Sequence, residues 1–117
     1  MPTGLAATRP ANDPWIALGD PTRREVLARV AERPRSVSEI ADGLPVSRPA
    51  VSQHLRVLLD ADLVVARRRG RQNIYRVRPE GFHRLRSELE WFWSEALENL
   101  KQLAEAGTEE VGDEPWE

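Results

Sequence analysis

The chain has 117 residues, of which 40% are hydrophobic and 31% are charged, and its formal net charge is −2. These values predict one small globular domain with tails. The sequence contains no apolar run long enough to cross a membrane, no signal-peptide pattern and no cysteine, which excludes disulfides and thiol chemistry. We therefore expect a cytoplasmic protein with no membrane partner.

The small net charge hides a separation of sign along the chain. Residues 1–46 carry six arginines and six acids, so this part is neutral. Residues 47–78 carry eight arginines and two acids, whereas residues 79–117 carry three basic residues and eleven acids. Only the middle third is therefore expected to meet a polyanion.

The N-terminal part is predicted to contain a tail and one short helix. Residues 1–11 are expected to form a flexible tail. A helix is predicted over residues 12–18, with an Asn or Asp N-cap, Pro14 in its first turn and Gly19 after its end.

The next two helices are predicted from their start signals. Asp20 followed by a proline is an N-cap with proline at the first helical position, and this helix stops before Pro34. Ser36 and Glu39 have the spacing of a capping box, and Gly43 ends the short third helix. The apolar residues expected to face inward are Val26, Leu27, Val30, Val37, Ile40 and Ala41.

A fourth helix is predicted from Ser47 to Leu59. Ser47 is a suitable N-cap, and Pro49 is tolerated only in a first turn. At helical period the chain presents one apolar stripe made of Val51, Leu55 and Leu58. A short helix, a Gly-containing turn and this second helix together predict a helix-turn-helix.

The other face of the fourth helix is polar and carries no acid. It presents Arg48, Ser52, Gln53 and Arg56. Arginine can pair with guanine and glutamine with adenine through two hydrogen bonds, so this face suits the DNA major groove. Ser47 and His54 are included among the predicted DNA contacts, although His54 sits beside the buried stripe and could equally serve helix packing. The alternative is an ordinary amphipathic surface helix.

A β-hairpin is predicted after the fourth helix. Residues 63–66 and 74–77 have β-propensity or alternation, and Gly70 marks the turn between them. Five arginines fall in residues 67–76, which favours a wing that reaches phosphates or a minor groove over a merely solvated tip. The wing residues predicted to contact DNA are Arg67, Arg69 and Arg71.

A long helix is predicted over residues 82–104, and its apolar strip is wide, with Trp91 and Trp93 both counted in it. One small domain has too little chain left to bury this strip, so we expect a second copy to cover it. The predicted dimerisation residues are Trp15, Ile16, Leu85, Leu89, Phe92, Trp93, Leu97 and Leu100. A core helix within one chain and an aromatic ligand site are the alternatives. Residues 105–117 are expected to form an acidic, disordered tail.

Four motifs taken together resemble the ArsR/SmtB family of bacterial winged-helix repressors. They are the segments 18–23, 51–58, 61–64 and 69–71 with Tyr75, in the family's order and spacing, and the resemblance covers about residues 14–104. It implies a mainly α winged helix-turn-helix with a small β-hairpin, forming a homodimer through its first and last helices. Asp62 departs from the glycine usual in the family, so the turn is expected to be slightly strained.

The resemblance also implies a question about metals. Many family members bind them through a Cys-x-Cys pair on the third helix or through Asp, His and Glu on the last helix. The third helix here has no cysteine, and the last helix has one histidine, His83. We therefore expect no metal and no cofactor, as in the metal-independent branch of the family, where the effector is often unknown or absent.

The function expected is a dimeric repressor that binds double-stranded DNA. A winged-helix module that binds an acidic protein and a MarR-like regulator are the alternatives. An enzyme is not expected, because the chain has no Gly-rich phosphate loop, no metal constellation and no evident triad partner for His54 or His83.

Overall fold

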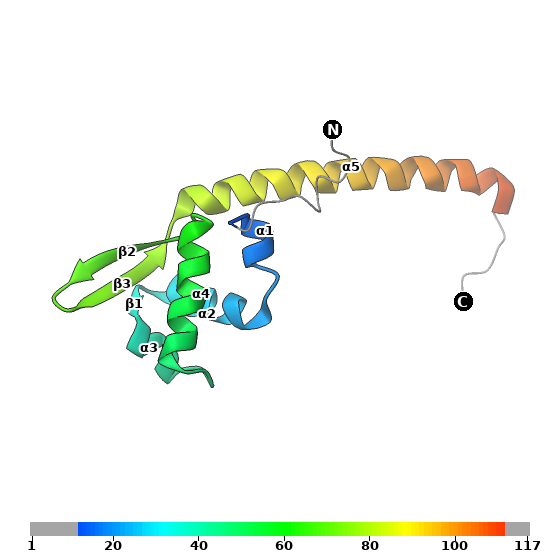
Figure 1. The fold of residues 1–117 in the computed structure, drawn as a ribbon. Helices are drawn as coiled ribbons and strands as arrows, with labels where there is room; N and C mark the ends of the chain where they lie inside the picture. Colours follow the sequence, from blue (N-terminus) through cyan, green and yellow to red (C-terminus); the bar gives the residue numbers. More distant parts are fainter. Residues whose placement is uncertain (1–11, 112–117) are drawn as a thin grey trace. The chain divides into compact units, whose positions relative to one another are not determined.

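The computed structural model of the protein describes residues 12–111, with side chains described up to residue 107. The predicted tail at residues 1–11 and the end of the acidic tail, residues 112–117, lie outside this range. The chain divides into two compact units, one ending at Leu85 and the other beginning at Arg86. Figure 1 labels the elements. They are α1 (Pro14–Ala17), α2 (Pro21–Glu32), β1 (Arg35–Ser36), α3 (Val37–Asp42), α4 (Arg48–Asp60), β2 (Val64–Arg69), β3 (Gln72–Val77) and α5 (Pro79–Val111).

The helices of the first unit begin where side chains satisfy free backbone N–H groups. The Asp20 carboxylate accepts hydrogen bonds from the N–H groups of Thr22 at 2.8 Å and Arg23 at 3.1 Å. The predicted capping box is present, with the Ser36 and Glu39 side chains each accepting from the other residue's N–H. The first helix is shorter than predicted, because its N-cap is Asp13 and it ends at Ala17.

The hairpin is part of a three-stranded antiparallel sheet with the order β1-β3-β2. β1 was not predicted, and it pairs Arg35 with Tyr75 and Ser36 with Ile74. Gly70 has a φ of 64°, which a glycine adopts without strain, and this allows the two-residue turn between β2 and β3.

One hydrophobic core joins the helices to the inner face of the sheet. It contains all the stripe residues of α4 and most of those predicted for α2 and α3, as well as residues from β2, β3 and the start of α5. Its buried members are Ala17, Val26, Leu27, Val30, Ile40, Val51, Leu55, Leu58, Ala61, Leu63, Val64, Tyr75 and Leu85. Val37 and Ala41, also predicted inward, are partly buried against this core.

The connection from α4 to β2 is tied to the start of α5. Asp62 has a φ of 61°, so the predicted left-handed turn is present and the aspartate stands where a glycine would be unstrained. Its carboxylate lies 3.6 Å from Arg78 and 3.6 Å from Arg84. A side chain at Gly81 would collide with the backbone carbonyl of Asp62, so only glycine lets the two segments approach this closely.

The last helix is longer than predicted at both ends. It starts at Pro79 rather than Phe82 and continues to Val111, so residues 105–111, predicted to be disordered, are helical. Within the described residues, no helix has the length and apolar character needed to cross a membrane.

Candidate nucleic-acid interface

The two faces of α4 lie as predicted. Val51, Leu55 and Leu58 are completely buried. The polar face is open to solvent at every position named for it, namely Arg48, Ser52, Gln53 and Arg56. Because one face is fixed in the core, the orientation of the polar face is fixed as well.

The helix start also sets what Ser47 can do. Its hydroxyl oxygen accepts a hydrogen bond from the Ala50 N–H at 3.2 Å, and this N-cap leaves the hydroxyl hydrogen for another acceptor. Ser47 is exposed. A phosphate oxygen is an acceptor of that kind.

His54 lies at the edge between the two faces. Its side chain is half-buried, and among the described residues its Nδ1 atom is buried without a hydrogen-bond partner. It is close to the start of α2, where the pKa of Asp20 is lowered mainly by the backbone hydrogen bond from Arg23, with an electrostatic contribution from His54. These observations favour packing between α2 and α4 as its main role.

The wing presents its predicted contacts to solvent. Arg67, Arg69 and Arg71 are exposed, and no carboxylate among residues 12–107 forms an ion pair with any of them. Arg68 differs, because its Nε donates to the Gly70 carbonyl at 3.0 Å across the turn. The free guanidinium groups are therefore concentrated on the strands and at the tip of the turn.

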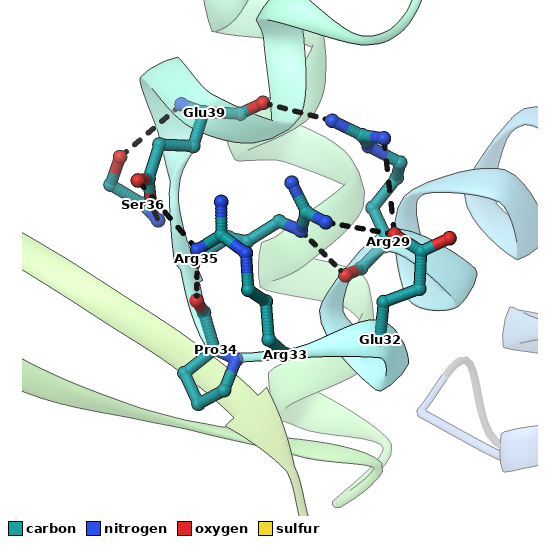
Figure 2. Close-up of polar contacts among 7 residues, drawn as sticks. All are labelled: Arg29, Glu32, Arg33, Pro34, Arg35, Ser36 and Glu39. Carbon is teal, nitrogen blue, oxygen red and sulfur yellow. Dashed lines mark hydrogen bonds and ion pairs between the residues drawn. The ribbon is translucent and has the colours of Figure 1, made fainter.

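Other arginines form hydrogen bonds and ion pairs that connect α2, β1 and α3 (Figure 2). Arg35 is nearly buried, and its Nε donates to the Arg29 carbonyl at 2.8 Å while its Nη2 pairs with Glu32 at 2.8 Å. Arg29 in turn donates to the Glu39 carbonyl at 3.4 Å. These bonds join α2, β1 and α3, and α4 packs on two of these elements, α2 and α3.

Gly43 has a role that its sequence context did not reveal. Its φ is −97°, an ordinary value, so it is not needed for a left-handed turn at the end of α3. A side chain at this position would collide with the guanidinium group of Arg29. Gly43 therefore gives Arg29 the room to reach the end of α3.

The second unit carries the predicted apolar strip of α5. Leu89, Phe92, Trp93, Leu97 and Leu100 are each 48–62% exposed. In the first unit, Ile16 of α1 is 45% exposed and Trp15 is partly buried against the core of its own chain.

Two residues depart from the predicted strip. Leu85 is only 8% exposed and belongs to the core of the first unit, so its side chain is already used within one chain. Trp91 is 66% exposed, but at about 100° per residue it lies roughly 160° from both Leu89 and Trp93. Its inclusion in the strip was wrong, because only the latter two face the same way.

No group of three or more His, Cys, Asp or Glu side chains that could hold a metal ion is present in the part of the chain that the structure describes. His83 is exposed. That the protein functions without a bound metal remains a prediction.

The fold and the exposed surface define a winged helix-turn-helix DNA-binding protein. A helix-turn-helix domain model matches residues 18–67. The HTH-type transcriptional regulator Rv2034 of Mycobacterium tuberculosis is 44% identical over 102 residues, which cover 87% of this chain and 95% of that protein. The HTH-type transcriptional repressor SmtB of the same organism is 41% identical over 61 residues, 52% of this chain and 45% of that protein.

Solved structures similar to this chain are also described as transcriptional regulators. An ArsR-like transcriptional regulator from Rhodococcus sp. RHA1 matches with a TM-score of 0.70 and 30% identity over 89% of this chain and 96% of that one. A homodimeric winged helix-turn-helix DNA-binding domain from Mycobacterium bovis, a possible ArsR-family regulator, matches with a TM-score of 0.55 and 30% identity over 68% of this chain and 73% of that one.

The chain belongs to the ArsR/SmtB family of winged helix-turn-helix transcriptional regulators. It is a DNA-binding transcription regulator and not an enzyme.

Proposed function

We propose that the protein represses transcription as a homodimer, by binding a palindromic operator through two copies of α4 and two wings. The observation that carries the proposal is the set of unpaired arginines on these two elements. α4 presents Arg48 and Arg56 around Gln53. The wing presents Arg67, Arg69, Arg71 and Arg76, while the ion pairs of the described residues lie on other elements. Such a surface lowers its own electrostatic self-repulsion by meeting phosphates.

The contacts divide into two kinds. Ser52, Gln53 and Arg56 face base edges in the major groove and select the sequence. Ser47, Arg48 and His54 lie at the edge of the groove. Arg67, Arg69 and Arg71 contact phosphates, and these contacts position the protein without reading the base sequence.

The dimer is formed by the apolar strip of α5 together with Trp15 and Ile16 of α1. From Leu89 to Leu103 the exposed strip runs along about 21 Å of helix, at 1.5 Å per residue. An apolar surface of this length is rare on a monomer, and a second copy supplies a matching strip by symmetry. A dimer also provides the two recognition helices that a palindrome requires, spaced by roughly 34 Å.

The test compares a substitution on the apolar strip of α5 with one on another face of the same helix. Footprinting on the DNA upstream of the gene identifies the operator, and sedimentation at micromolar concentration reports the oligomeric state. We expect the parent to be a dimer and Trp93→Arg to be a monomer whose operator affinity falls by more than about 100-fold, since one half-site contact is lost. Trp91→Arg is the matched control, and it should remain a dimer with the parent's affinity.

A monomeric parent at micromolar concentration would contradict the dimer. A parent that binds the operator no better than random DNA of equal length would contradict sequence-specific repression. In the second case, the alternative of a module that recognises an acidic protein becomes the better account.

A further inference from the structure

The register of the hairpin sorts its side chains onto two faces of the sheet. Directly opposed residues of an antiparallel pair share a face. Val64 and Tyr75 are buried, so the side chains in register with them face the core. Arg67 lies opposite Ile74 on the other, outer face, and Arg76, two residues further along β3, shares that face.

A shallow hollow of about 360 Å³ lies on this outer face, and its volume falls within the range of small-molecule sites. The register of β1 continues to place Pro34 beside Arg76, so the hollow extends across the sheet from β1 to β2. No acid among the described residues lines it. The lining residues are Pro34, Arg67, Arg68, Arg69, Ile74 and Arg76.

The arginines around the hollow form an anion site without its counter-charge. Arg67, Arg69 and Arg76 are exposed and form no ion pair with a carboxylate among residues 12–107. Arg68 is held in place because its Nε donates to the Gly70 carbonyl at 3.0 Å, and this bond leaves its Nη groups to donate to a ligand. Guanidinium groups bind phosphate oxygens in a forked geometry. A phosphate in the hollow would lower the repulsion between these like charges.

The apolar part of the lining favours a ligand that is more than a bare phosphate. Ile74 is half-buried and lies between Arg67 on β2 and Arg76 on its own strand, and Pro34 is exposed at the β1 edge. Neither side chain can donate a hydrogen bond to an anion. Both are covered from water only when an apolar group lies against them. The lining therefore suits a molecule in which a phosphate and an apolar body are joined.

We propose that the outer face of the wing is a regulatory site for a small organic phosphate with an apolar body, and that this ligand releases the protein from DNA. The arginines hold the phosphate, while Ile74 and Pro34 receive the apolar body. Arg67 and Arg69 are also phosphate contacts in the proposed function, so the ligand and DNA compete for them. The regulatory step rests on the proposed function, whereas the ligand site itself does not.

The first experiment measures the site on the full chain without DNA. Phenyl phosphate and inorganic phosphate are titrated into the isotope-labelled protein, and the amide signals of β2 and β3 are followed by nuclear magnetic resonance. We expect both probes to shift these signals. Phenyl phosphate should bind roughly tenfold more tightly, because its ring removes the apolar floor from water.

Two variants separate the two parts of the lining. Ile74→Thr keeps a β-branched side chain in the strand and should keep the affinity for inorganic phosphate while losing the preference for phenyl phosphate. Arg76→Gln should weaken both probes by roughly fivefold, because a charge-assisted hydrogen bond is lost. Arg84→Gln removes the same charge from an exposed position next to Asp62, outside the wing, and should bind both probes like the parent. Thermal unfolding verifies that each variant is folded.

The second experiment measures release from DNA by fluorescence anisotropy on the footprinted operator. The ionic strength is held constant with sodium chloride, so that general screening does not change between samples. Phenyl phosphate should weaken operator binding by the parent more than inorganic phosphate does at the same concentration. Ile74→Thr should bind the operator like the parent and respond equally to the two probes.

The outcomes distinguish the ligand site from the proposed function. Phenyl phosphate that binds no more tightly than inorganic phosphate, or a preference that survives in Ile74→Thr, overturns the ligand site while the proposed function stands. Tight binding of phenyl phosphate without any loss of operator affinity overturns the regulatory step. A parent that shows the ligand preference but binds the operator no better than random DNA overturns the proposed function and the regulatory step, and the ligand site stands.

Discussion

The protein uses arginine in two opposite ways in two neighbouring regions. In the α2–β1–α3 region, Arg29, Arg33 and Arg35 each donate to a backbone carbonyl and lie near Glu32 or Glu39 (Figure 2). On α4 and the wing, the arginines have no carboxylate partner among the described residues.

The difference shows that arginine count alone does not locate an interface. A guanidinium group that is already hydrogen-bonded within the chain would have to break those bonds to bind DNA. A group without a partner has only water to release, so its charge is available to a phosphate. Substitution of the arginines in the α2–β1–α3 region should therefore change the stability of the protein, whereas substitution of those on α4 and the wing should change its affinity for DNA.

Among the arginine substitutions, the largest effect is expected at the tip of the wing. Arg69→Ala combined with Arg71→Ala should weaken binding to all DNA sequences alike, by roughly 100-fold at physiological salt, and should reduce the salt slope by about 3.6 for the four phosphates of a dimer. The midpoint of thermal unfolding should stay near that of the parent. Equal affinity of the double variant and the parent at every salt concentration would mean that the wing does not contact DNA.

The opposite pattern is expected at Arg35. Arg35→Ala removes two charge-assisted hydrogen bonds from a nearly buried site and should lower the free energy of unfolding by about 2 kcal/mol, measured by urea denaturation. At a temperature where the variant is folded, its salt slope should equal that of the parent. Arg33→Ala is the control: its ion pair is exposed, so its effect should stay below about 0.5 kcal/mol. A similar loss at both positions would remove the distinction between them.

The sequence could predict the features of this fold that depend on residues close together in the chain. The N-caps of α2, α3 and α4 follow from Asp20, Ser36 and Ser47, because each cap depends on residues no more than three positions away. The two faces of α4 follow equally from helical period. Their burial agrees with the prediction at every stripe position.

The remainder depends on contacts between distant residues. β1 is two residues long, too short for any alternation, and it exists because β3 supplies its partners. Leu85 continues the periodic pattern of α5, yet it lies in the core because the start of α5 closes over Asp62 through Gly81. The helix continues past Gly107 because one internal glycine costs only about 1 kcal/mol, too little to end it.

The wing shows the same limit for the candidate site, because residues distant in sequence line a hollow on it: Pro34, Arg67, Arg68, Arg69, Ile74 and Arg76. Sequence gathered the arginines into one segment, but only the register shows that Arg67 and Arg76 share a face with Ile74. The contribution of Pro34 required β1, which was not predicted.

Within α4, two positions that are two residues apart should show the same contrast between binding and stability. Gln53→Ala should leave the stability and the salt slope nearly unchanged and relax selection at one base position per half-site, by about 1–3 kcal/mol for the preferred base. Val51→Ala should lower the free energy of unfolding by about 2 kcal/mol, because it removes buried methyl groups and leaves a small cavity. It should weaken binding to all sequences together.

Binding-site selection with each variant provides the measurement. If Gln53→Ala recovered the parent's motif at every position and Val51→Ala altered it, the assignment of the two faces would be reversed.

The smallest effect concerns stability at acid pH. It arises at the N-termini of two helices, from Asp20 at α2 and from Glu39 in the capping box of α3. The backbone hydrogen bond from Arg23 lowers the pKa of Asp20 from its ordinary value of 3.8, and the backbone hydrogen bond from Ser36 lowers the pKa of Glu39 from 4.5. In both cases the folded state favours the charged carboxylate. The resulting stabilisation is complete above the unfolded pKa and is lost as the pH falls through the lower folded pKa.

Asp20→Asn and Glu39→Gln keep an acceptor oxygen at each cap and remove the titration. Urea denaturation of the parent should therefore show a loss of stability between about pH 5 and pH 2 that is shallower in the double variant, while DNA contacts on α4 and the wing are untouched. At pH 7 the double variant should unfold at a slightly lower urea concentration than the parent, because a neutral side chain interacts less strongly with a helix N-terminus. An identical decline in the two proteins would show that these caps do not contribute to acid sensitivity, and the carboxylates responsible would then have to lie elsewhere.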